Sequence, residues 1–244
     1  MRPVLFRWHG WTIWSYPAML YVGAVCGILA GTRQAREVGL DAFRVWIALF
    51  VLLGIALLGA RALFVATEWP TFRNDLRRIW ERQRGGAAQY GGLLAAVPAS
   101  WPLLGALDVP VGAFWDVGAV AILVAMMFTR VGCLLNGCCA GRPVRFFGVN
   151  LPNHRGVWRR RVPTQLLECG FAAALLVLVL IVEPRLPFDG ALFLIAAGGY
   201  ATGRLLLESA RERGSDEGPF TTQHGISLLI MAIAFTGLAA FWPG

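Results

Sequence analysis

The stretch LLECGFAAALLVLVLIV, residues 166–182, decides the fold class of this 244-residue chain. Its only charged residue is Glu168, which lies near the start of a long aliphatic run. A helix that crosses a lipid bilayer needs about 20 mostly apolar residues, and a charge in the hydrocarbon is costly. The stretch therefore predicts a membrane-spanning helix that carries one carboxylate near its first turn.

Six further apolar runs lie on either side of this stretch, at residues 13–31, 45–66, 90–107, 109–129, 188–207 and 225–242. The whole chain is 57% hydrophobic and 15% charged, whereas a soluble domain has about 25% charged residues. We therefore expect an all-α integral membrane protein with about seven transmembrane helices, formed as a single domain over residues 1–244. The run at 90–107 contains Pro98 and Pro102, which predict a kink.

Two polar segments interrupt the apolar runs. Residues 68–84 place Phe72, Leu76 and Trp80 at helical spacing among five arginines, which predicts an amphipathic helix at the membrane interface. Residues 142–161 hold six arginines and two prolines, which indicate an irregular, arginine-rich extramembrane loop. Both segments fall on the side of the N-terminus, so the positive-inside rule places that side in the cytoplasm.

The densest group of polar and small residues is TRVGCLLNGCCAGR, residues 129–142. Arg130 ends an apolar run, and Gly132, Gly137 and Gly141 allow tight turns or close backbone approach. A fixed guanidinium beside such backbone is a candidate anion site. The alternative is an arginine that reaches to the interface and glycines that serve helix packing.

The same segment contains Cys133, Cys138 and Cys139. Their C-x4-C-C spacing differs from the C-x2-C pairs of zinc sites, and His154 is the only further donor nearby. We expect no metal here and favour thiols that pack among apolar groups. A disulfide remains an alternative.

A second polar group lies in the run at 188–207 and just beyond it. Helical spacing puts Tyr200, Arg204, Glu208 and Arg211 on one face. Such a face must turn toward protein or water rather than lipid. Ion pairs that only hold helices together would produce the same pattern.

Six segments resemble, in order, those of the prolipoprotein diacylglyceryl transferase family. They are Tyr16 with Leu20-Tyr21-Val22-Gly23, Gly59-Ala60-Arg61, Tyr90-Gly91-Gly92-Leu93, the signature-like stretch from Arg130 to Arg142, Arg161-x-Pro163-x-Gln165-Leu166-x-Glu168, and Tyr200-x-x-x-Arg204-x-x-x-Glu208-x-x-Arg211. The likeness spans nearly the whole chain.

The chain also departs from the family pattern at five positions. Tyr90 stands where the family has a histidine before Gly-Gly, and Val162 stands where it has a histidine before proline. Cys133 replaces the signature asparagine, Cys138 replaces the signature glutamate, and Thr129 replaces the leading glycine. These departures bear on catalysis more than on fold.

The resemblance implies transfer of a diacylglyceryl group from phosphatidylglycerol, or a related anionic phospholipid, to the lipobox cysteine thiol of precursor lipoproteins. It implies a multi-pass protein of the bacterial cell membrane, without a cofactor and without nucleic acid as a partner. It also implies the membrane orientation opposite to that of the positive-inside rule. Two alternatives stay open: a non-catalytic or altered-substrate phospholipid-binding paralogue, and a membrane thiol redox protein that uses the three clustered cysteines.

The resemblance also suggests roles for individual residues. Arg130 and Arg204 would stabilise the leaving phosphate, and Tyr90 would occupy the position of the family histidine. Substrate binding would involve Tyr16, Arg61, Gly91, Gly92, Gly132, Asn136, Gly137, Gly141, Glu168, Tyr200 and Glu208.

Overall fold

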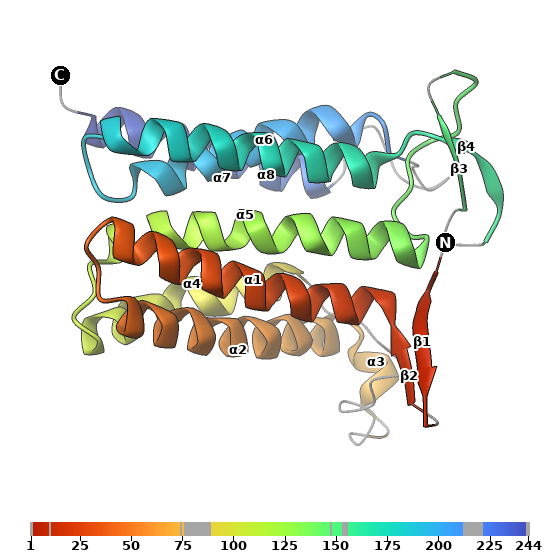
Figure 1. Cartoon of the computed structure of the whole chain (residues 1–244), viewed down its shortest axis with the longest axis horizontal. Helices are drawn as coiled ribbons and strands as arrows, with labels where there is room; N and C mark the ends of the chain where they lie inside the picture. The colour runs from red at the N-terminus through yellow and green to blue at the C-terminus, as the bar shows by residue number, and fades with distance from the viewer. Residues whose placement is uncertain are drawn as a thin grey trace.

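The computed structural model describes residues 2–9, 11–73, 75, 89–146, 148–152, 156–211 and 222–242. Seven helices of 18 to 26 residues make up most of this part of the chain (Figure 1). They are α1 (Ser15–Glu37), α2 (Ala42–Thr67), α4 (Gln89–Ala106), α5 (Val111–Asn136), α6 (Thr164–Val182), α7 (Ala191–Glu208) and α8 (Thr222–Phe241). Each corresponds to one of the apolar runs, so the helical fold class predicted from the sequence is confirmed.

Six of these helices are long and apolar enough to cross a membrane. The remaining helix, α4, is shorter in its apolar part, Gly91–Ala106, and contains Pro98 and Pro102. Large apolar side chains point outward from the bundle, for example Leu94 at 70% and Phe235 at 77% exposure. Exposed apolar side chains on apolar helices are what a protein dissolved in lipid requires, because the bilayer replaces water as the solvent.

Helix α5 lies at the centre of the bundle. It contacts α1 and α4 on one side and α6 and α7 on the other (Figure 1). One core cluster joins α1, α2, α4 and α5 around Leu52, Leu104 and Phe114, and a second joins α5, α6 and α7 around Leu123 and Leu192. The two sub-bundles therefore share one helix, which can carry a residue into a site between them.

Helices α1 and α5 approach each other closely because glycines line their contact. A Cβ atom on Gly23 would lie 2.8 Å from the carbonyl oxygen of Ala125, and one on Gly27 would lie 2.5 Å from that of Ala121. Small residues let membrane helices pack backbone against backbone, which increases their dispersion contacts. These glycines thus fix the distance between α1 and the central helix.

Two antiparallel hairpins lie at the end of the bundle that carries the N-terminus (Figure 1). The first pairs β1 (Val4–Trp8) with β2 (Trp11–Trp14), and the second pairs β3 (Val149–Pro152) with β4 (Trp158–Arg161). The second hairpin corrects the prediction of an irregular loop at 142–161. Leu151 and Arg161 are buried there at 2% and 1% exposure, so the segment packs against the bundle despite its arginines.

The predicted interfacial helix at 68–84 lies largely outside the described residues. The structure contains its first turn, α3 (Trp69–Phe72), in which Phe72 is 2% exposed and packs edge-on against Phe64 with ring centroids 6.1 Å apart. The prediction of a longer amphipathic helix therefore stays untested.

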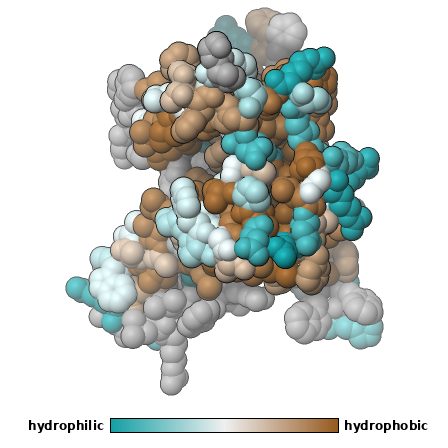
Figure 2. Space-filling model, turned by 90° about the vertical axis from the view of Figure 1, so that its left-hand side faces the viewer, coloured by the Kyte–Doolittle hydropathy of each residue, from teal (hydrophilic) through white to brown (hydrophobic). Residues whose placement is uncertain are grey.

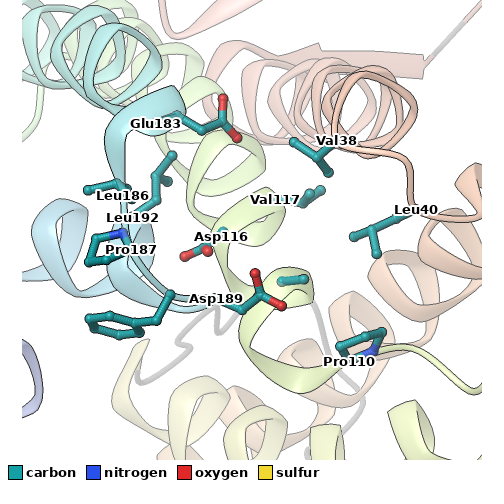
Figure 3. A pocket seen from close by; sticks show the side chains of 12 residues that line it. Val38, Leu40, Pro110, Asp116, Val117, Glu183, Leu186, Pro187, Asp189 and Leu192 are labelled. Carbon is teal, nitrogen blue, oxygen red and sulfur yellow. The ribbon is translucent and has the colours of Figure 1, made fainter. Parts of the chain in front are cut away.

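The opposite end of the bundle carries the α1–α2 and α6–α7 connections, the latter with a short 3-10 helix, η3 (Glu183–Arg185). Figure 2 looks onto this end and shows hydrophilic side chains gathered between apolar flanks. A cavity of about 310 Å³ lies here, lined in part by Asp116, Glu183 and Asp189 (Figure 3). Asp116 accepts hydrogen bonds from the backbone N–H groups of Gly190 and Phe193, at 2.7 and 2.8 Å, and so caps the start of α7.

Candidate anion site between α5, α6 and α7

The carboxylate of Glu168 is the centre of a buried charge cluster at the hairpin end of the bundle. Its Oε2 lies 2.5 Å from Nε of Arg130, and its Oε1 lies 2.9 Å from Nη1 of Arg204 and 2.8 Å from Nη2 of Arg211. The Glu168 side chain is only 3% exposed. Three guanidinium groups from three parts of the chain thus converge on one carboxylate.

A second carboxylate completes the cluster. Glu208 lies 3.5 Å from Arg204 and 3.8 Å from Arg211. The three arginine side chains are 13–22% exposed, so three positive and two negative charges share a largely dehydrated space. Counted over the described residues of this cluster, one net positive charge is left. Buried charges are tolerated only when paired, and an excess of arginine in such a place favours an added anion.

Local chain geometry explains how the members meet. Arg130 lies within two turns of the C-terminal end of α5, Glu168 lies just after the start of α6, and Arg204 lies one turn before the end of α7. The three helix ends are adjacent because α5 contacts both α6 and α7. The ion pairs therefore also hold these helices together, as the alternative interpretation of the sequence proposed.

The prediction that Arg211 shares one helical face with Tyr200, Arg204 and Glu208 is wrong in one detail, because Arg211 lies beyond the helix. Helix α7 ends at Glu208, and Arg211 follows two turn residues in an isolated β-bridge with Gly141. The backbone N–H of Arg142 also bonds to the carbonyl of Ala210, at 2.9 Å. Arg211 therefore reaches Glu168 from a backbone contact beyond the helix and not from the helical face itself.

Tyr200 and Tyr16 flank Arg130. The Nη2 group of Arg130 donates a hydrogen bond to the Tyr200 hydroxyl, at 3.3 Å. Tyr16, in the first turn of α1, interacts electrostatically with Arg130 and with the thiols of the nearby cysteines. Arg130 thus lies between the arginine–glutamate cluster and a second polar region that contains the cysteines.

Several predicted site glycines serve backbone geometry in the structure. Gly137 ends α5 with a φ of 75°, and a Cβ on Gly132 would lie 2.9 Å from Cβ of Met19 on α1. A Cβ on Gly141 would lie 2.5 Å from the carbonyl oxygen of Ala210. The tight turns and close approaches expected for these positions are confirmed, while a contact with substrate stays a prediction.

The glycines after Tyr90 lie at the contact between α2 and α4. A Cβ on Gly92 would lie 3.0 Å from the carbonyl oxygen of Ala56, and Gly91 faces the backbone of Gly59. Tyr90 belongs to α4, but its side chain lies outside the part of the structure that is described. The catalytic role predicted for Tyr90 therefore rests on its position in the sequence.

Two other predicted substrate-binding residues lie apart from the contacts just given. Arg61, on α2, places its guanidinium carbon 5.5 Å from the ring centroid of Phe64 and 5.9 Å from that of Phe72. Asn136 is the last residue of α5 and is exposed. It directly precedes Gly137, where the loop that carries Cys138 and Cys139 begins.

Three side chains to which the sequence pattern assigns no role hold the loop after α5. Gln165 Nε2 donates to the Cys138 carbonyl at 2.6 Å, and Thr164 Oγ1 donates to the Cys139 carbonyl at 2.7 Å. Arg161, 1% exposed, donates to the Gly141 carbonyl at 3.3 Å. All three belong to the segment that ends in Glu168, but a sequence pattern does not show that they bind the loop at 137–141.

The loop also changes the acidity of one thiol outside the membrane-spanning helices. A hydrogen bond from Cys133, with a second from Cys139, lowers the pKa of the Cys138 thiol below its ordinary value. Hydrogen bonds to a thiolate stabilise the charged form, which is the physical cause of such a shift.

The fold and the cluster together define a multi-pass membrane protein with a buried arginine–carboxylate site at one end of its helix bundle. Residues 3–240 match the sequence profile of the family described as prolipoprotein diacylglyceryl transferase. The chain belongs to this family, whose bacterial members place it in the bacterial cell membrane.

The chain is also similar over most of its length to curated bacterial proteins. A phosphatidylglycerol–prolipoprotein diacylglyceryl transferase 2 of Clostridium perfringens is 28% identical over 95% of this chain and 92% of its own length. A phosphatidylglycerol–prolipoprotein diacylglyceryl transferase of Bacillus cytotoxicus is 29% identical over 91% and 86%. One of Clostridioides difficile is 24% identical over 94% and 91%. The likeness therefore covers the complete helix bundle and not one segment of it.

Proposed function

We propose that this protein transfers a diacylglyceryl group from phosphatidylglycerol to the cysteine thiol of a precursor lipoprotein. Family membership and the names of the similar proteins support the reaction class. The observation that carries the proposal is the convergence of Arg130, Arg204 and Arg211 on Glu168, since the reaction releases a phosphate group. The partners are then an anionic phospholipid and precursor lipoproteins, which meet in the bilayer.

In this reaction the thiol sulfur attacks the carbon of the diacylglyceryl group that carries the phosphate ester. The carbon–sulfur bond forms, the carbon–oxygen bond to phosphate breaks, and glycerol-1-phosphate leaves with the bonding electron pair. Negative charge grows on the leaving phosphate, so donors already aimed at that place lower the barrier. We assign this role to Arg130 and Arg204, which are the catalytic residues of the proposal.

Glu168 and Tyr200 fix the direction of these guanidinium groups. Arg130 uses Nε for Glu168 and Nη2 for Tyr200, while Arg204 uses Nη1 for Glu168. A guanidinium has five N–H donors, so each arginine keeps others for a phosphate. Glu168, Tyr200 and Glu208 therefore act as positioning residues in the proposal.

Proton removal from the attacking thiol is the second requirement, because the ordinary thiol pKa of about 8.5 leaves little thiolate at neutral pH. We propose that Tyr90, in the place of the family histidine, relays this proton or holds a headgroup oxygen. A tyrosine with a pKa near 10 is a weak base, so the step is expected to be slow. Tyr16, Arg61, Asn136 and the glycines at 91, 92, 132, 137 and 141 would line the lipid path.

The second candidate is a phospholipid-binding paralogue that does not catalyse transfer. The observation that favours it is the replacement of the family histidine by Tyr90 and of the signature glutamate by Cys138. The arginine cluster would serve equally to hold an anionic headgroup without reaction. The two functions differ in product formation and not in lipid binding.

Complementation of a bacterial strain depleted of its own transferase tests the proposal in cells. The gene is expected to restore growth and to add the diacylglyceryl mass to a reporter lipoprotein. Arg204→Ala serves as the matched inactive variant, with its amount in the membrane measured by immunoblot. A wild-type chain that reaches the membrane in normal amount but adds no lipid to the reporter would favour the paralogue.

A further inference from the structure

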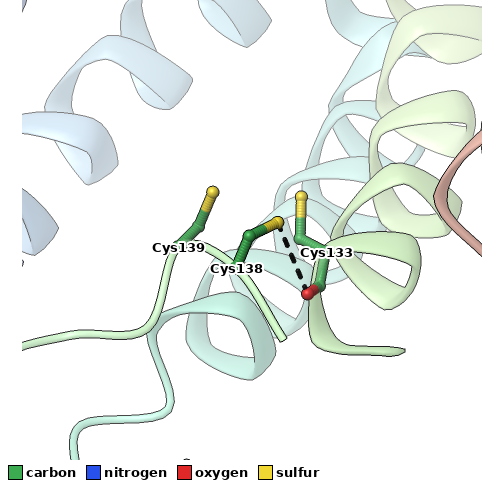
Figure 4. Close-up of side chains that lie close together, drawn as sticks. All are labelled: Cys133, Cys138 and Cys139. Atoms are coloured by element: carbon green, nitrogen blue, oxygen red, sulfur yellow. Dashed lines mark hydrogen bonds between the residues drawn. The ribbon is translucent and has the colours of Figure 1, made fainter. Parts of the chain in front are cut away.

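Three cysteines meet beside the arginine cluster without belonging to it. Cys133 lies in the last turn of α5, and Cys138 and Cys139 lie in the loop that follows. Their three Sγ atoms all lie within 4.8 Å of one another, and all three thiols are free (Figure 4). The C-x4-C-C spacing by itself does not predict this convergence.

Two left-handed backbone positions bring the sulfur atoms together. Gly137 has a φ of 75° and ends the helix, and Cys139 has a φ of 63°. A residue with a side chain is strained in such a conformation and adopts it only where its surroundings hold it. The loop therefore folds back over the end of α5 and places Cys138 and Cys139 beside Cys133.

Helix α6 holds this loop in place. Gln165 and Thr164 donate hydrogen bonds to the carbonyl groups of Cys138 and Cys139, and Cys138 Sγ lies 3.7 Å from the Cys133 carbonyl oxygen. Both carbonyl bonds come from side chains at the start of a long helix, so the arrangement of the thiols does not depend on a bound ligand. Preformed geometry of this kind lowers the entropic cost of binding an ion.

The dimensions fit an ion held by three sulfur atoms. Thiolate sulfurs bind a zinc-sized ion at about 2.3 Å, which puts three sulfurs around one ion about 4 Å apart. The three Sγ atoms lie within 4.8 Å of one another, so only a small movement would bring them to this separation. A disulfide would need two sulfurs at about 2.05 Å and would leave the third cysteine without a role.

The number of ligands decides the class of ion. Structural zinc sites are almost always four-coordinate, whereas soft thiolates also select Cu(I). Among the residues that the structure describes, no fourth cysteine, histidine, aspartate or glutamate joins the group. Three thiolates with one monovalent ion carry a net charge of −2, and Arg130 and Arg211 interact electrostatically with the cluster. The arginine cluster, which keeps one net positive charge beside its two carboxylates, offsets part of that excess.

We propose that Cys133, Cys138 and Cys139 form a three-thiolate binding site for one soft, monovalent metal ion of the Cu(I) type. Cys133 is buried, Cys138 is half-buried and Cys139 is exposed, so the exposed thiol gives the ion its path of entry. The proposal revises the expectation of no metal that followed from the spacing. It does not depend on the transferase reaction, because binding is measured without lipid.

A competition titration tests this site. The full chain is purified in detergent, reduced, freed of reductant without oxygen and titrated with Cu(I) held by a coloured chelator such as bicinchoninate. We expect one Cu(I) per chain and an X-ray absorption spectrum with three sulfur neighbours at about 2.3 Å. Cys133→Ser and Cys138→Ser should each lower the Cu(I) affinity by more than about 100-fold. Loss of a residue that only hydrogen-bonds to a metal ligand already lowers metal affinity by about 10–100-fold, and loss of the ligand itself should cost more.

Cys26→Ser and Cys169→Ser are the matched controls, because these free cysteines lie on α1 and α6 outside the cluster. Both variants should bind Cu(I) like the wild type, and all variants must elute as a single species from size exclusion. The proposal is overturned if the wild type takes up no stoichiometric Cu(I), if the Cys133→Ser and Cys138→Ser proteins bind as tightly as the controls, or if Zn(II) displaces Cu(I) at equal concentration.

Discussion

Arg130 and Glu168 face each other across the contact between α5 and α6, with 2.5 Å between Nε and Oε2. Arg204 and Arg211 bind the other oxygen of the same carboxylate, at 2.9 and 2.8 Å. Glu168 is thus both a link between helices and the group that directs the arginines. The first consequence concerns stability, because removal of one member of a buried charge cluster leaves the others without compensation.

Glu168→Gln should destabilise the protein strongly. Breaking a buried ion pair by removal of one partner costs about 3–5 kcal/mol, which lowers the melting temperature on the order of 10 °C in a chain of this size. Thermal unfolding of the detergent-solubilised protein measures the shift. The control is Glu37→Gln, because Glu37 pairs with Arg33 at the surface, where the side chains are 53% and 83% exposed. Equal melting temperatures for the two variants would show that the cluster does not hold the helices together.

Arg204→Lys should slow the transfer reaction although the substitution keeps the positive charge at this position. Lysine cannot bind Glu168 and a phosphate through a planar fork, so we expect a loss of about 10²–10³-fold in the rate of product formation, the range for removal of one directed donor. The rate at saturating phospholipid measures it. Arg33→Lys, on the exposed part of α1, is the control and should keep the wild-type rate. A rate for Arg204→Lys within threefold of the control would remove Arg204 from the catalytic residues.

Gly59→Ala should disturb the contact between α2 and α4. A Cβ at this position would lie 2.5 Å from the Gly91 carbonyl oxygen, so the helices must move apart at a cost of about 1–3 kcal/mol. Gly54→Ala lies on the same helix with nothing within 4 Å of the added carbon and is the matched control. Thermal unfolding should show a lower melting temperature for Gly59→Ala alone. Equal unfolding of both variants would contradict the close approach.

Tyr90→His should be at least as active as the wild type. The substitution restores the family residue before Gly91 and Gly92 and supplies a group with a pKa near 6.5, and general acid–base help contributes about 10²–10⁴-fold. Single-turnover rates with a lipobox peptide measure the gain, and Tyr90→Phe is the matched control for loss of the hydroxyl. A Tyr90→His protein that is slower than Tyr90→Phe would show that this position has no part in proton transfer.

The positions of the seven helices could be predicted from the sequence because an apolar run of membrane length has few other stable structures in lipid. The ends of the helices were less predictable. Helix α5 continues to Asn136, past the predicted end at 129, because the charge of Arg130 is neutralised by Glu168 and does not need to reach water. The hairpin β3–β4 was not predicted, because its arginines indicated a solvent-exposed loop. In the structure Arg161 is buried.

The candidate site, like the fold, could be predicted from the sequence only in part. Arg130, Arg204 and Glu168 could be selected because each is a rare charge within an apolar run. Their common meeting point, and the reach of Arg211 from beyond α7, depend on how three helix ends pack. The convergence of the cysteines depends on the left-handed turn at Cys139, which no local pattern predicts for a residue other than glycine.

The measurement that tests the central proposal most directly is thioether formation in a reconstituted system. Wild-type protein and Arg130→Ala are placed in vesicles that contain labelled phosphatidylglycerol, and a lipobox peptide with one cysteine is added. We expect labelled diacylglyceryl peptide and free glycerol-1-phosphate from the wild type, and no product from Arg130→Ala present at equal amount. If the wild type binds phospholipid normally but forms no product from any phospholipid, the transferase function is contradicted and the lipid-binding paralogue takes its place.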